Sequence, residues 1–464
     1  MKRASLSALF DPRSVALIGA SSDPGKIGYR LAANLLGRPF NGSVYFVNPK
    51  GTTILGKASL RTIEELPEAI DLMILAVPKT AIMPSVRAGI RKRVRCIVAL
   101  TAGFKETGDA GHALEDQLRE LLQGSETRLV GPNCAGLADT GSSLHATIEI
   151  YPGRGRIAMV SQSGSLCSAF SSNIRIRQAG VSKYISLGNK VDVDEADLVE
   201  YLGEDEATAC IALYIEDIND GRRLREVATR VCRTKPIVAL KSGRTEEGAR
   251  ATYSHTGAMA GSDTLVEGAL RQMGVLRADD LTQLYDLSAV LSVLKPLPGK
   301  RIAILSDAGG PGVIATDAAV QAGLEIPQLS AETKRRLLGF LPPFSSVQNP
   351  IDMTFTRDVR LYGRCILELH GENIDAVLVT IPSHFTVKQD LVSVLAEAKQ
   401  RHGLSLVVAW LAADEVEEQR RELWKQGIPC FSDPRTAAAA LGALSRYGQW
   451  LARRRNHVEH SEIS

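Results

Sequence analysis

Short apolar runs alternate along this chain with segments whose apolar residues recur at helical spacing. The apolar runs of the first third are residues 13–19, 44–48, 71–77, 96–100 and 128–131. Residues 79–92 and 111–122, which lie between such runs, have the periodicity of amphipathic helices. Runs that are apolar throughout and rich in β-branched residues are typical of strands buried on both faces. The alternation therefore predicts βαβ units and a parallel sheet.

The same alternation restarts twice. A second block has predicted strands at residues 157–160, 209–215 and 236–240. Two prolines and a glycine in residues 294–300 indicate a boundary, and a third block follows with strands at 301–306, 376–381 and 404–410 and a last helix at 435–452. We predict an α/β protein with domains at residues 1–138, 150–295 and 299–455, and a polar, frayed tail at 456–464.

Composition narrows the class of protein. With 44% hydrophobic and 23% charged residues, the 464-residue chain resembles an ordinary soluble protein. The 55 basic and 52 acidic residues are too balanced to indicate nucleic-acid binding, and no apolar run reaches the length of a membrane span. The N-terminus lacks the features of a secretory signal, and the seven cysteines contain no CxxC pair. These features predict a cytoplasmic protein with buried thiols and no metal site.

A glycine-containing turn follows the first predicted strand, at residues 19–28 (Gly-Ala-Ser-Ser-Asp-Pro-Gly-Lys-Ile-Gly). A turn of this kind before a helix can present backbone N–H groups to a phosphate, although the spacing is not GxGxxG. After the second strand comes Asn48-Pro49-Lys50, where a plain nicotinamide dinucleotide site would have an acidic residue. A lysine there favours a phosphorylated ribose, as in NADP or coenzyme A. A turn that serves packing alone is the alternative.

Three further strand ends have sequences that suit a ligand along the carboxyl edge of the sheet, where open α/β sheets bind ligands. They are Val77-Pro78, residues 101–104 (Thr-Ala-Gly-Phe) and residues 131–133 (Gly-Pro-Asn). The second block contains a comparable turn at residues 161–164 (Ser-Gln-Ser-Gly). We interpret Ser163 there as an anion-binding residue, because a nucleophilic serine needs a GxSxG elbow. Capping of the helix without a ligand is the alternative for Ser163.

His255 lies in a loop of small residues, with Ser254, Thr256 and Gly257 beside it. Such a loop leaves room for a group carried on the imidazole, and a phosphorylated imidazole needs a carboxylate to orient its other ring nitrogen. Glu216, at the end of a predicted strand, is a candidate for that carboxylate, and capping of a helix is its alternative role. The acidic residues of 192–197 lack the pattern of an EF-hand loop, and we interpret them as a solvated helix start.

In this order along the chain, these sequences resemble the nucleoside-diphosphate-forming acyl-CoA synthetases, relatives of succinyl-CoA synthetase, and among them the α subunits of ADP-forming acetate–CoA ligases. The resemblance covers nearly the whole chain and implies a Rossmann-like CoA-binding domain followed by two flavodoxin-like ligase domains. The matching segments are residues 19–22, 47–50, 101–104, 131–133, 161–164, 236–244, 254–257, 309–312 and 349–352.

The resemblance also implies roles for single residues. His255 matches the phosphorylated histidine of the family, Glu216 the glutamate that supports it, and Ser163 and Gly164 the helix start that receives the phosphate. The implied reaction interconverts acyl-CoA, phosphate and ADP with carboxylic acid, CoA and ATP through an acyl phosphate and a phosphohistidine. The residues implied for coenzyme A are Gly19, Ser21, Ser22, Lys26, Asn48, Lys50, Val77, Pro78, Thr101, Gly103 and Asn133.

Two further features of the sequence concern a partner subunit and a departure from the family pattern. Nothing in the sequence resembles an ATP-grasp domain, so the resemblance implies an ATP-grasp β subunit in a hetero-oligomer, which binds ADP or ATP with Mg²⁺. The family commonly has Asn where this chain has Asp307, which adds a negative charge near the glycines of residues 309–312. The alternatives are a regulatory module that binds CoA or acyl-CoA without ligase turnover, and an NADP-dependent oxidoreductase.

Overall fold

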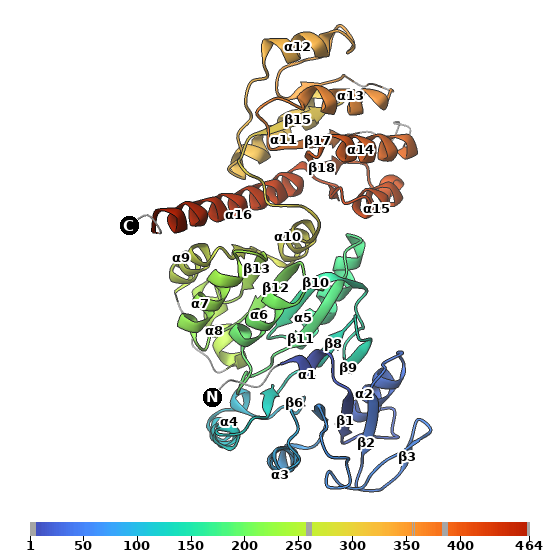
Figure 1. Cartoon of the computed structure of the whole chain (residues 1–464), viewed down its shortest axis with the longest axis vertical. Coiled ribbons are helices and arrows are strands. Elements are labelled where there is room, and N and C mark those ends of the chain that lie inside the picture. Colours follow the sequence, from blue (N-terminus) through green and yellow to red (C-terminus); the bar gives the residue numbers. More distant parts are fainter. Residues whose placement is uncertain (1–5, 257–261, 355, 357, 383–387, 462–464) are drawn as a thin grey trace. The chain divides into compact units, whose positions relative to one another are not determined.

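The computed structural model describes residues 6–256, 262–354, 356, 358–382 and 388–461. The chain divides into two compact units: unit 1 contains residues 1–175 and 179–288, and unit 2 contains residues 176–178 and 289–464. Each unit is built of strands and helices in alternation (Figure 1). None of the helices in the described ranges has both the length and the apolar character needed to cross a bilayer.

The first sheet of unit 1 is parallel, with strand order β2-β1-β5-β6-β7. Its strands are β1 (Ser14–Ile18), β2 (Ser43–Val47), β5 (Leu72–Leu75), β6 (Cys96–Ala99) and β7 (Arg128–Val130). The other elements around it are α1 (Ser7–Phe10), α2 (Ile27–Leu36), the hairpin β3 (Thr53–Ile54) and β4 (Lys57–Ala58), α3 (Lys79–Arg91), η1 (Lys105–Thr107) and α4 (Asp109–Leu122). All residues of β5, β6 and β7 are buried, which confirms the expectation of strands covered on both faces.

The second sheet of unit 1 has the order β14-β13-β12-β10-β11-β8-β9 (Figure 1). Its parallel strands are β10 (Arg154–Ser161), β11 (Val181–Ser186), β12 (Cys210–Ile215), β13 (Ile237–Lys241) and β14 (Leu276–Arg277). The hairpin of β8 (Gly136–Asp139) and β9 (Leu144–Thr147) joins this sheet antiparallel to β11, and the sequence pattern did not reveal it. The helices are α5 (Gly164–Ile176), α6 (Glu195–Glu204), α7 (Gly221–Val231), α8 (Glu246–Thr256), α9 (Asp263–Met273) and α10 (Leu281–Val293).

Unit 2 contains a third parallel sheet, of order β16-β15-β17-β18-β19. The strands are β15 (Ile302–Ser306), β16 (Ile351–Asp352), β17 (Ala376–Ile381), β18 (Ser405–Trp410) and β19 (Cys430–Phe431). The helices are α11 (Gly309–Gln321), α12 (Ala331–Leu338), α13 (Arg360–Leu369), α14 (Lys388–His402), η2 (Asp414–Val416), α15 (Glu417–Lys425) and α16 (Pro434–Ser461). Helix α16 extends to Ser461 and so includes the first residues of the tail predicted at 456–464.

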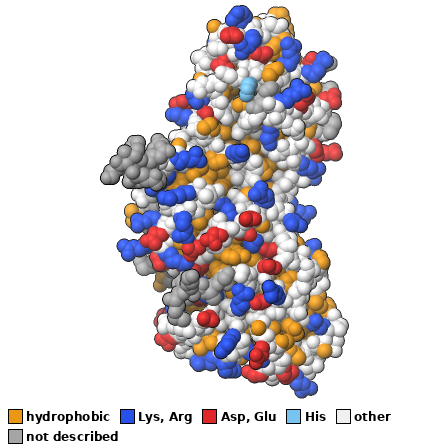
Figure 2. Space-filling model, viewed as in Figure 1, with side chains coloured by type: hydrophobic (Ala, Val, Ile, Leu, Met, Phe, Trp, Pro, Cys, Tyr) orange, Lys and Arg blue, Asp and Glu red, His pale blue; other side chains and the backbone are white. Residues whose placement is uncertain are grey.

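Two expectations about side chains have different outcomes. All seven cysteines are free and buried, as predicted, and burial raises the pKa of the Cys96 thiol to about 12. The acidic residues of 192–197 do form a helix start, because Asp194 caps α6 in a capping box with Asp197. They are not solvated, however: Glu195 and Asp197 are buried. On the visible face in Figure 2, basic and acidic side chains are intermingled.

Buried ion pairs explain why these acidic side chains are inside. Arg128 of β7 contacts Asp192 through Nε at 2.9 Å and Asp197 through a terminal nitrogen at 2.8 Å. The Leu129 N–H donates to Asp192 at 2.8 Å, and the Val193 N–H donates to the Leu129 carbonyl at 3.0 Å. The segment before α6 is therefore fixed to the edge strand of the first sheet, which joins the two sheets of unit 1.

Replacing Arg128 by methionine is expected to destabilise unit 1 by about 3 kcal/mol, because it removes the cation from Asp192 and leaves the buried Asp197 with Arg223 alone of its two arginines. All three tryptophans, Trp410, Trp424 and Trp450, lie in unit 2, so unit 1 must be followed by hydrogen exchange of β7 amides during urea unfolding. The matched control is Arg91→Met, whose pair with Glu64 is exposed and contributes less than about 1 kcal/mol. Equal effects of the two substitutions would contradict this prediction.

Candidate functional site

The residues predicted to bind coenzyme A lie at the carboxyl ends of successive strands of the first sheet, or in the turns that follow them. Gly19, Ser21, Ser22 and Lys26 follow β1, and Asn48 and Lys50 follow β2. Val77 and Pro78 follow β5, Thr101 and Gly103 follow β6, and Asn133 follows β7. Because all these strands are parallel, the structure brings the predicted residues to one edge of one sheet.

Close packing requires the glycines of the first turn. Gly19 has a φ of +88°, and a Cβ atom there would lie 2.3 Å from the Ala76 carbonyl oxygen. A Cβ atom on Gly28 would lie 2.0 Å from the carbonyl oxygen of Gly19. Close packing therefore requires glycine at these two positions, and it brings the start of α2 close to the end of β1.

Side-chain hydrogen bonds hold neighbouring strand ends together. Asn48 donates to the Ala20 carbonyl at 2.7 Å, and Thr101 donates to the Val77 carbonyl at 2.6 Å. The side chain of Lys26, the N-cap residue of α2, is exposed, and so is that of Lys50 in the turn after β2. The helix N-terminus and the two ammonium groups make this edge attractive to phosphates.

Asn133 has a different environment from the other predicted residues. Its backbone N–H donates to the Thr101 carbonyl at 2.9 Å, so it does belong to the same edge. Its side chain, however, donates to Asn189 Oδ1 at 3.3 Å, on the loop after β11. Asn133 thus links the edge of the first sheet to the second sheet.

The turn at residues 161–164 connects β10 to α5. The buried Ser161 hydroxyl donates to the Ser163 carbonyl at 2.7 Å and accepts from the Ser163 N–H at 3.1 Å, which closes the turn tightly. Ser163 Oγ lies 3.1 Å from Ser165 Oγ, a hydroxyl and not a base, so its surroundings favour anion binding over nucleophilic attack. A Cβ atom on Gly164 would lie 2.5 Å from Ala135 Cβ, so α5 can begin this close to β8 only with glycine.

Glu216 and Asp217 directly follow β12, beside the turn at residues 161–164, because Ser161 pairs with Tyr214 in the sheet. Both carboxylates are buried. Gln162 reaches from the turn to both: its amide oxygen accepts the N–H groups of Glu216 and Asp217, and its amide nitrogen donates to Asp217 Oδ1. Gln162 lies within a segment that the sequence analysis quoted, and Asp217 directly follows the predicted Glu216, but only their contact reveals a shared role.

Lysines surround Asp217. Lys190 Nζ lies 2.8 Å from Asp217 Oδ1 and 3.1 Å from Glu195 Oε2, and Lys105 Nζ lies 3.9 Å from Asp217 Oδ2. Burial alone would raise the pKa of Asp217, but the charge and hydrogen bond of Lys190 outweigh it and lower that pKa below its usual value. Asp217 is therefore an anion at neutral pH.

His255 belongs to the last turn of α8, so its predicted place in a loop was wrong. Its side chain lies outside the described residues, as do those of Ser254 and Thr256. The helix itself is placed: α8 packs against η1, which begins two residues after Gly103. Since Lys105 of η1 also approaches Asp217, the histidine-bearing helix, the turn after β6 and the turn after β12 meet in one region of unit 1.

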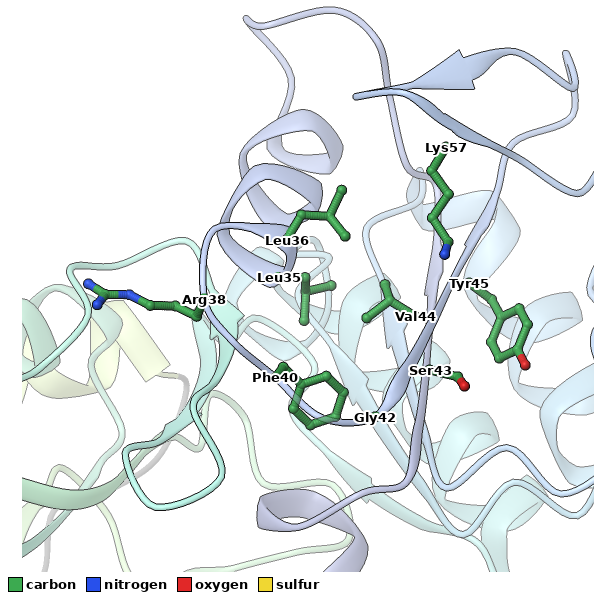
Figure 3. Close-up of a pocket in the computed structure, with 9 residues that line it drawn as sticks. All are labelled: Leu35, Leu36, Arg38, Phe40, Gly42, Ser43, Val44, Tyr45 and Lys57. Carbon is green, nitrogen blue, oxygen red and sulfur yellow. The ribbon is translucent and has the colours of Figure 1, made fainter.

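A separate pocket of about 410 Å³ lies on the first domain, between the end of α2 and the start of β2 (Figure 3). Phe40, Tyr45 and Lys57 are among its lining residues. It includes Ser43, the first residue of β2, whereas the predicted coenzyme A residues lie at the other ends of the strands. This pocket is therefore not the site described above.

Asp307 of unit 2 directly follows β15 and is almost completely buried. Among the described residues, its Oδ1 atom has no hydrogen-bond partner. Burial raises the pKa of Asp307 to about 6, an effect larger than the opposing one of the Tyr362 hydroxyl beside it. The negative charge that the sequence predicted at Asp307 is thus present at neutral pH, but it is buried away from water.

Three family descriptions match successive parts of the chain. "CoA binding domain" matches residues 13–140, "Succinyl-CoA ligase like flavodoxin domain" matches residues 154–291, and "Ligase-CoA domain" matches residues 302–455. The α subunit of acetate–CoA ligase [ADP-forming] II from Pyrococcus furiosus is 38% identical over 95% of this chain and 97% of its own length. The chain belongs to the family of ADP-forming acetate–CoA ligase α subunits.

Other members of the family agree in sequence and in fold. Acetate–CoA ligase [ADP-forming] I of Archaeoglobus fulgidus is 39% identical over 97% of this chain, which spans 65% of that longer protein. The acetyl-coenzyme A synthetase 1 of Ca. Korarchaeum cryptofilum, solved in complex with phosphate and ADP, superposes with a TM-score of 0.92. It is 32% identical, and the match covers 98% of this chain and 99% of that one. These ligase relatives do not favour a regulatory module or an oxidoreductase.

The environment of Asp307 leads to a pH-dependent prediction for this ligase α subunit. A carboxyl whose folded pKa is raised loses stability as the pH rises from about 4, where it ionises in the unfolded chain, to about 6, where it ionises in the fold. Asp307→Asn is therefore expected to stabilise unit 2 by about 2 kcal/mol at pH 8 and by nothing below about pH 4. Urea unfolding followed by tryptophan fluorescence measures this, since all three tryptophans lie in unit 2. A gain independent of pH would contradict it.

Proposed function

We propose that this chain is the α subunit of an NDP-forming acyl-CoA synthetase of the ADP-forming acetate–CoA ligase type. It interconverts acyl-CoA, phosphate and ADP with carboxylic acid, CoA and ATP. In the direction of ATP formation, a phosphate oxygen attacks the thioester carbonyl, the C–S bond breaks, and CoA leaves as the protonated thiol. A ring nitrogen of His255 then attacks phosphorus, the P–O bond to the acyl group breaks, and the carboxylate leaves.

The observation that carries this proposal is the meeting of three elements in unit 1. Helix α8, whose last turn contains His255, packs against η1, close to the Thr101–Gly103 turn of the CoA-binding domain. Through Lys105, the same η1 approaches the turn that holds Glu216 and Asp217. A phosphoryl group formed beside an acyl thioester at this edge would therefore be near the histidine that accepts it.

Each predicted residue has a role in this scheme. The strand ends from Gly19 to Asn133 bind coenzyme A, with the exposed Lys26 and Lys50 interacting with its phosphates. Ser163 and Gly164, at the start of α5, bind the transferred phosphoryl group. The Glu216 carboxylate accepts the N–H of the imidazole nitrogen that stays free, and so supports the phosphohistidine.

We assign the binding site for ADP or ATP to a partner subunit. The chain covers 97% of an α subunit but only 65% of a longer relative, which supports a nucleotide site outside this chain. We assign ADP or ATP with Mg²⁺ to an ATP-grasp β subunit in a hetero-oligomer, and the domains of this chain to residues 1–138, 150–295 and 299–455. The buried free thiols support a cytoplasmic enzyme.

Incubation of the chain with acetyl-CoA and ³²P-labelled phosphate is expected to label His255 with an acid-labile, alkali-stable phosphoryl group. The label should be absent from His255→Asn. Glu216→Gln should slow its formation by about 10²-fold, since an uncharged amide supports the developing imidazolium less well. Calorimetric titration with CoA should give similar affinities for all three proteins, because neither residue belongs to the CoA edge.

Equal labelling of His255→Asn, or an acid-stable adduct, would overturn the phosphohistidine mechanism. Binding of CoA without any labelling would instead favour a binding module without ligase turnover. Addition of a purified ATP-grasp β subunit and ADP should transfer the label to ATP, and loss of the label without ATP formation would contradict the assignment of the partner.

A further inference from the structure

Gln162 makes an unusual set of contacts for a partly exposed glutamine. From the turn between β10 and α5, its amide oxygen accepts the N–H of Asp217 at 3.0 Å and also the N–H of Glu216. Its amide nitrogen donates to Asp217 Oδ1. One side chain thus fixes two consecutive peptide groups and one carboxylate of a turn 54 residues away in the sequence.

Asp217, which accepts the hydrogen bond from the Gln162 amide, is itself held in place by a buried lysine. Lys190 donates to Asp217 Oδ1 and to the Asp217 carbonyl, both at 2.8 Å, and its side chain is completely buried. Glu195 lies 3.1 Å from the same ammonium group and balances its charge. Turning Lys190 towards water would remove the cation 3.1 Å from the buried Glu195 and leave Asp217 with Lys105 at 3.9 Å, so Asp217 offers Gln162 a fixed partner.

The same polar cluster reaches the turn on the CoA side. Lys105 donates to the Asn189 carbonyl at 3.0 Å, and the Asn189 amide donates to Glu106 Oε2 at 2.7 Å. Glu106 Oε1 in turn accepts the N–H groups of Gly103 at 2.6 Å and Phe104 at 3.1 Å. The turns after β6 and β12 are therefore parts of one hydrogen-bonded framework.

We infer that Gln162 is a positioning residue, which sets the direction of the Glu216 carboxylate relative to the phosphate-binding turn that Gln162 itself belongs to. The inference rests on the proposed function and extends it to a residue that acts through Glu216. Two hydrogen bonds to the backbone of residues 216 and 217 fix where the Glu216 side chain leaves the chain. Without them the turn keeps its Lys190 anchor on Asp217, but the peptide before it can rotate.

The test measures the single-turnover rate of ³²P incorporation at His255 from acetyl-CoA and labelled phosphate. Gln162→Ala is expected to lower this rate about tenfold, while the acetyl-CoA concentration for half-maximal rate stays within about twofold. The matched control is Gln283→Ala. Gln283 makes the same kind of hydrogen bonds to Asp279. Its amide oxygen accepts the Asp279 N–H at 3.0 Å, and its amide nitrogen donates to the Asp279 carboxylate at 3.2 Å. The control should label at the wild-type rate.

A double-mutant cycle separates positioning from a general loss of structure. If Gln162 acts through Glu216, then Gln162→Ala should change the rate by less than about twofold in a Glu216→Gln background. Multiplicative effects of the two substitutions, or a wild-type rate in Gln162→Ala, would overturn the inference. Absence of labelling in the wild-type chain would instead refute the proposed function, so the two failures are distinguishable.

A second variant covers the case in which Gln162→Ala does not fold. Asp217→Asn keeps the shape of the side chain and an acceptor for Gln162 but removes the charge that Lys190 holds. It is expected to slow labelling severalfold, again only when Glu216 is intact. If Asp217→Asn folds and labels at the wild-type rate in the presence of Glu216, the framework does not position Glu216 and the inference fails.

Discussion

The buried ammonium group of Lys190 is the constraint on which the candidate site depends. A lysine without solvent contact must be neutralised where it stands, and here Glu195 and Asp217 do this at 3.1 and 2.8 Å. Burial raises the pKa of Glu195 in spite of the lysine, whereas the pKa of Asp217, surrounded by more donors, is lowered. Asp217 therefore stays ionised to a lower pH than Glu195, and the turn that carries Glu216 is built upon it.

A second constraint is the set of polar contacts that joins the first sheet to loops of the second sheet. Arg128 and its carboxylates join the edge strand of the first sheet to the segment that leads into α6. Asn189 bridges from the loop after β11 to Glu106, which holds the turn after β6. Hydrogen bonds and ion pairs of this kind require particular distances and angles. They therefore restrict the position of one sheet relative to the other more than apolar contacts would.

This arrangement suits a reaction in which a phosphoryl group is transferred from one ligand to another. The CoA side contributes exposed lysines and strand-end turns, and the second sheet contributes a helix start and a carboxylate turn. The buried Asp307 of unit 2 departs from this pattern of satisfied charges, because its Oδ1 atom has no hydrogen-bond partner among the described residues. The resemblance to the family led us to expect asparagine at this position, and an asparagine would bury no charge.

The sequence predicted much of this because its signals are local. Apolar runs identified the strands, and the order of strands and helices identified parallel sheets, so residues at strand ends could be grouped at one edge before any coordinates. The periodicity of apolar residues did not predict features that depend on residues far apart in the sequence. The hairpin of β8 and β9 is too short for a clear pattern, and residues 192–197 read as solvated because their cations lie elsewhere in the chain.

By itself, then, the sequence predicted the strand–helix order, the sheet edge that we propose for CoA, and Glu216 and His255 as candidate site residues. The tertiary structure decided what holds that site in place: Gln162 against the turn 54 residues later, and Asp217 between Lys105 and Lys190. The physical reason is that local spacing records which side chains become buried. The partner that neutralises a buried charge is settled only when distant segments pack together.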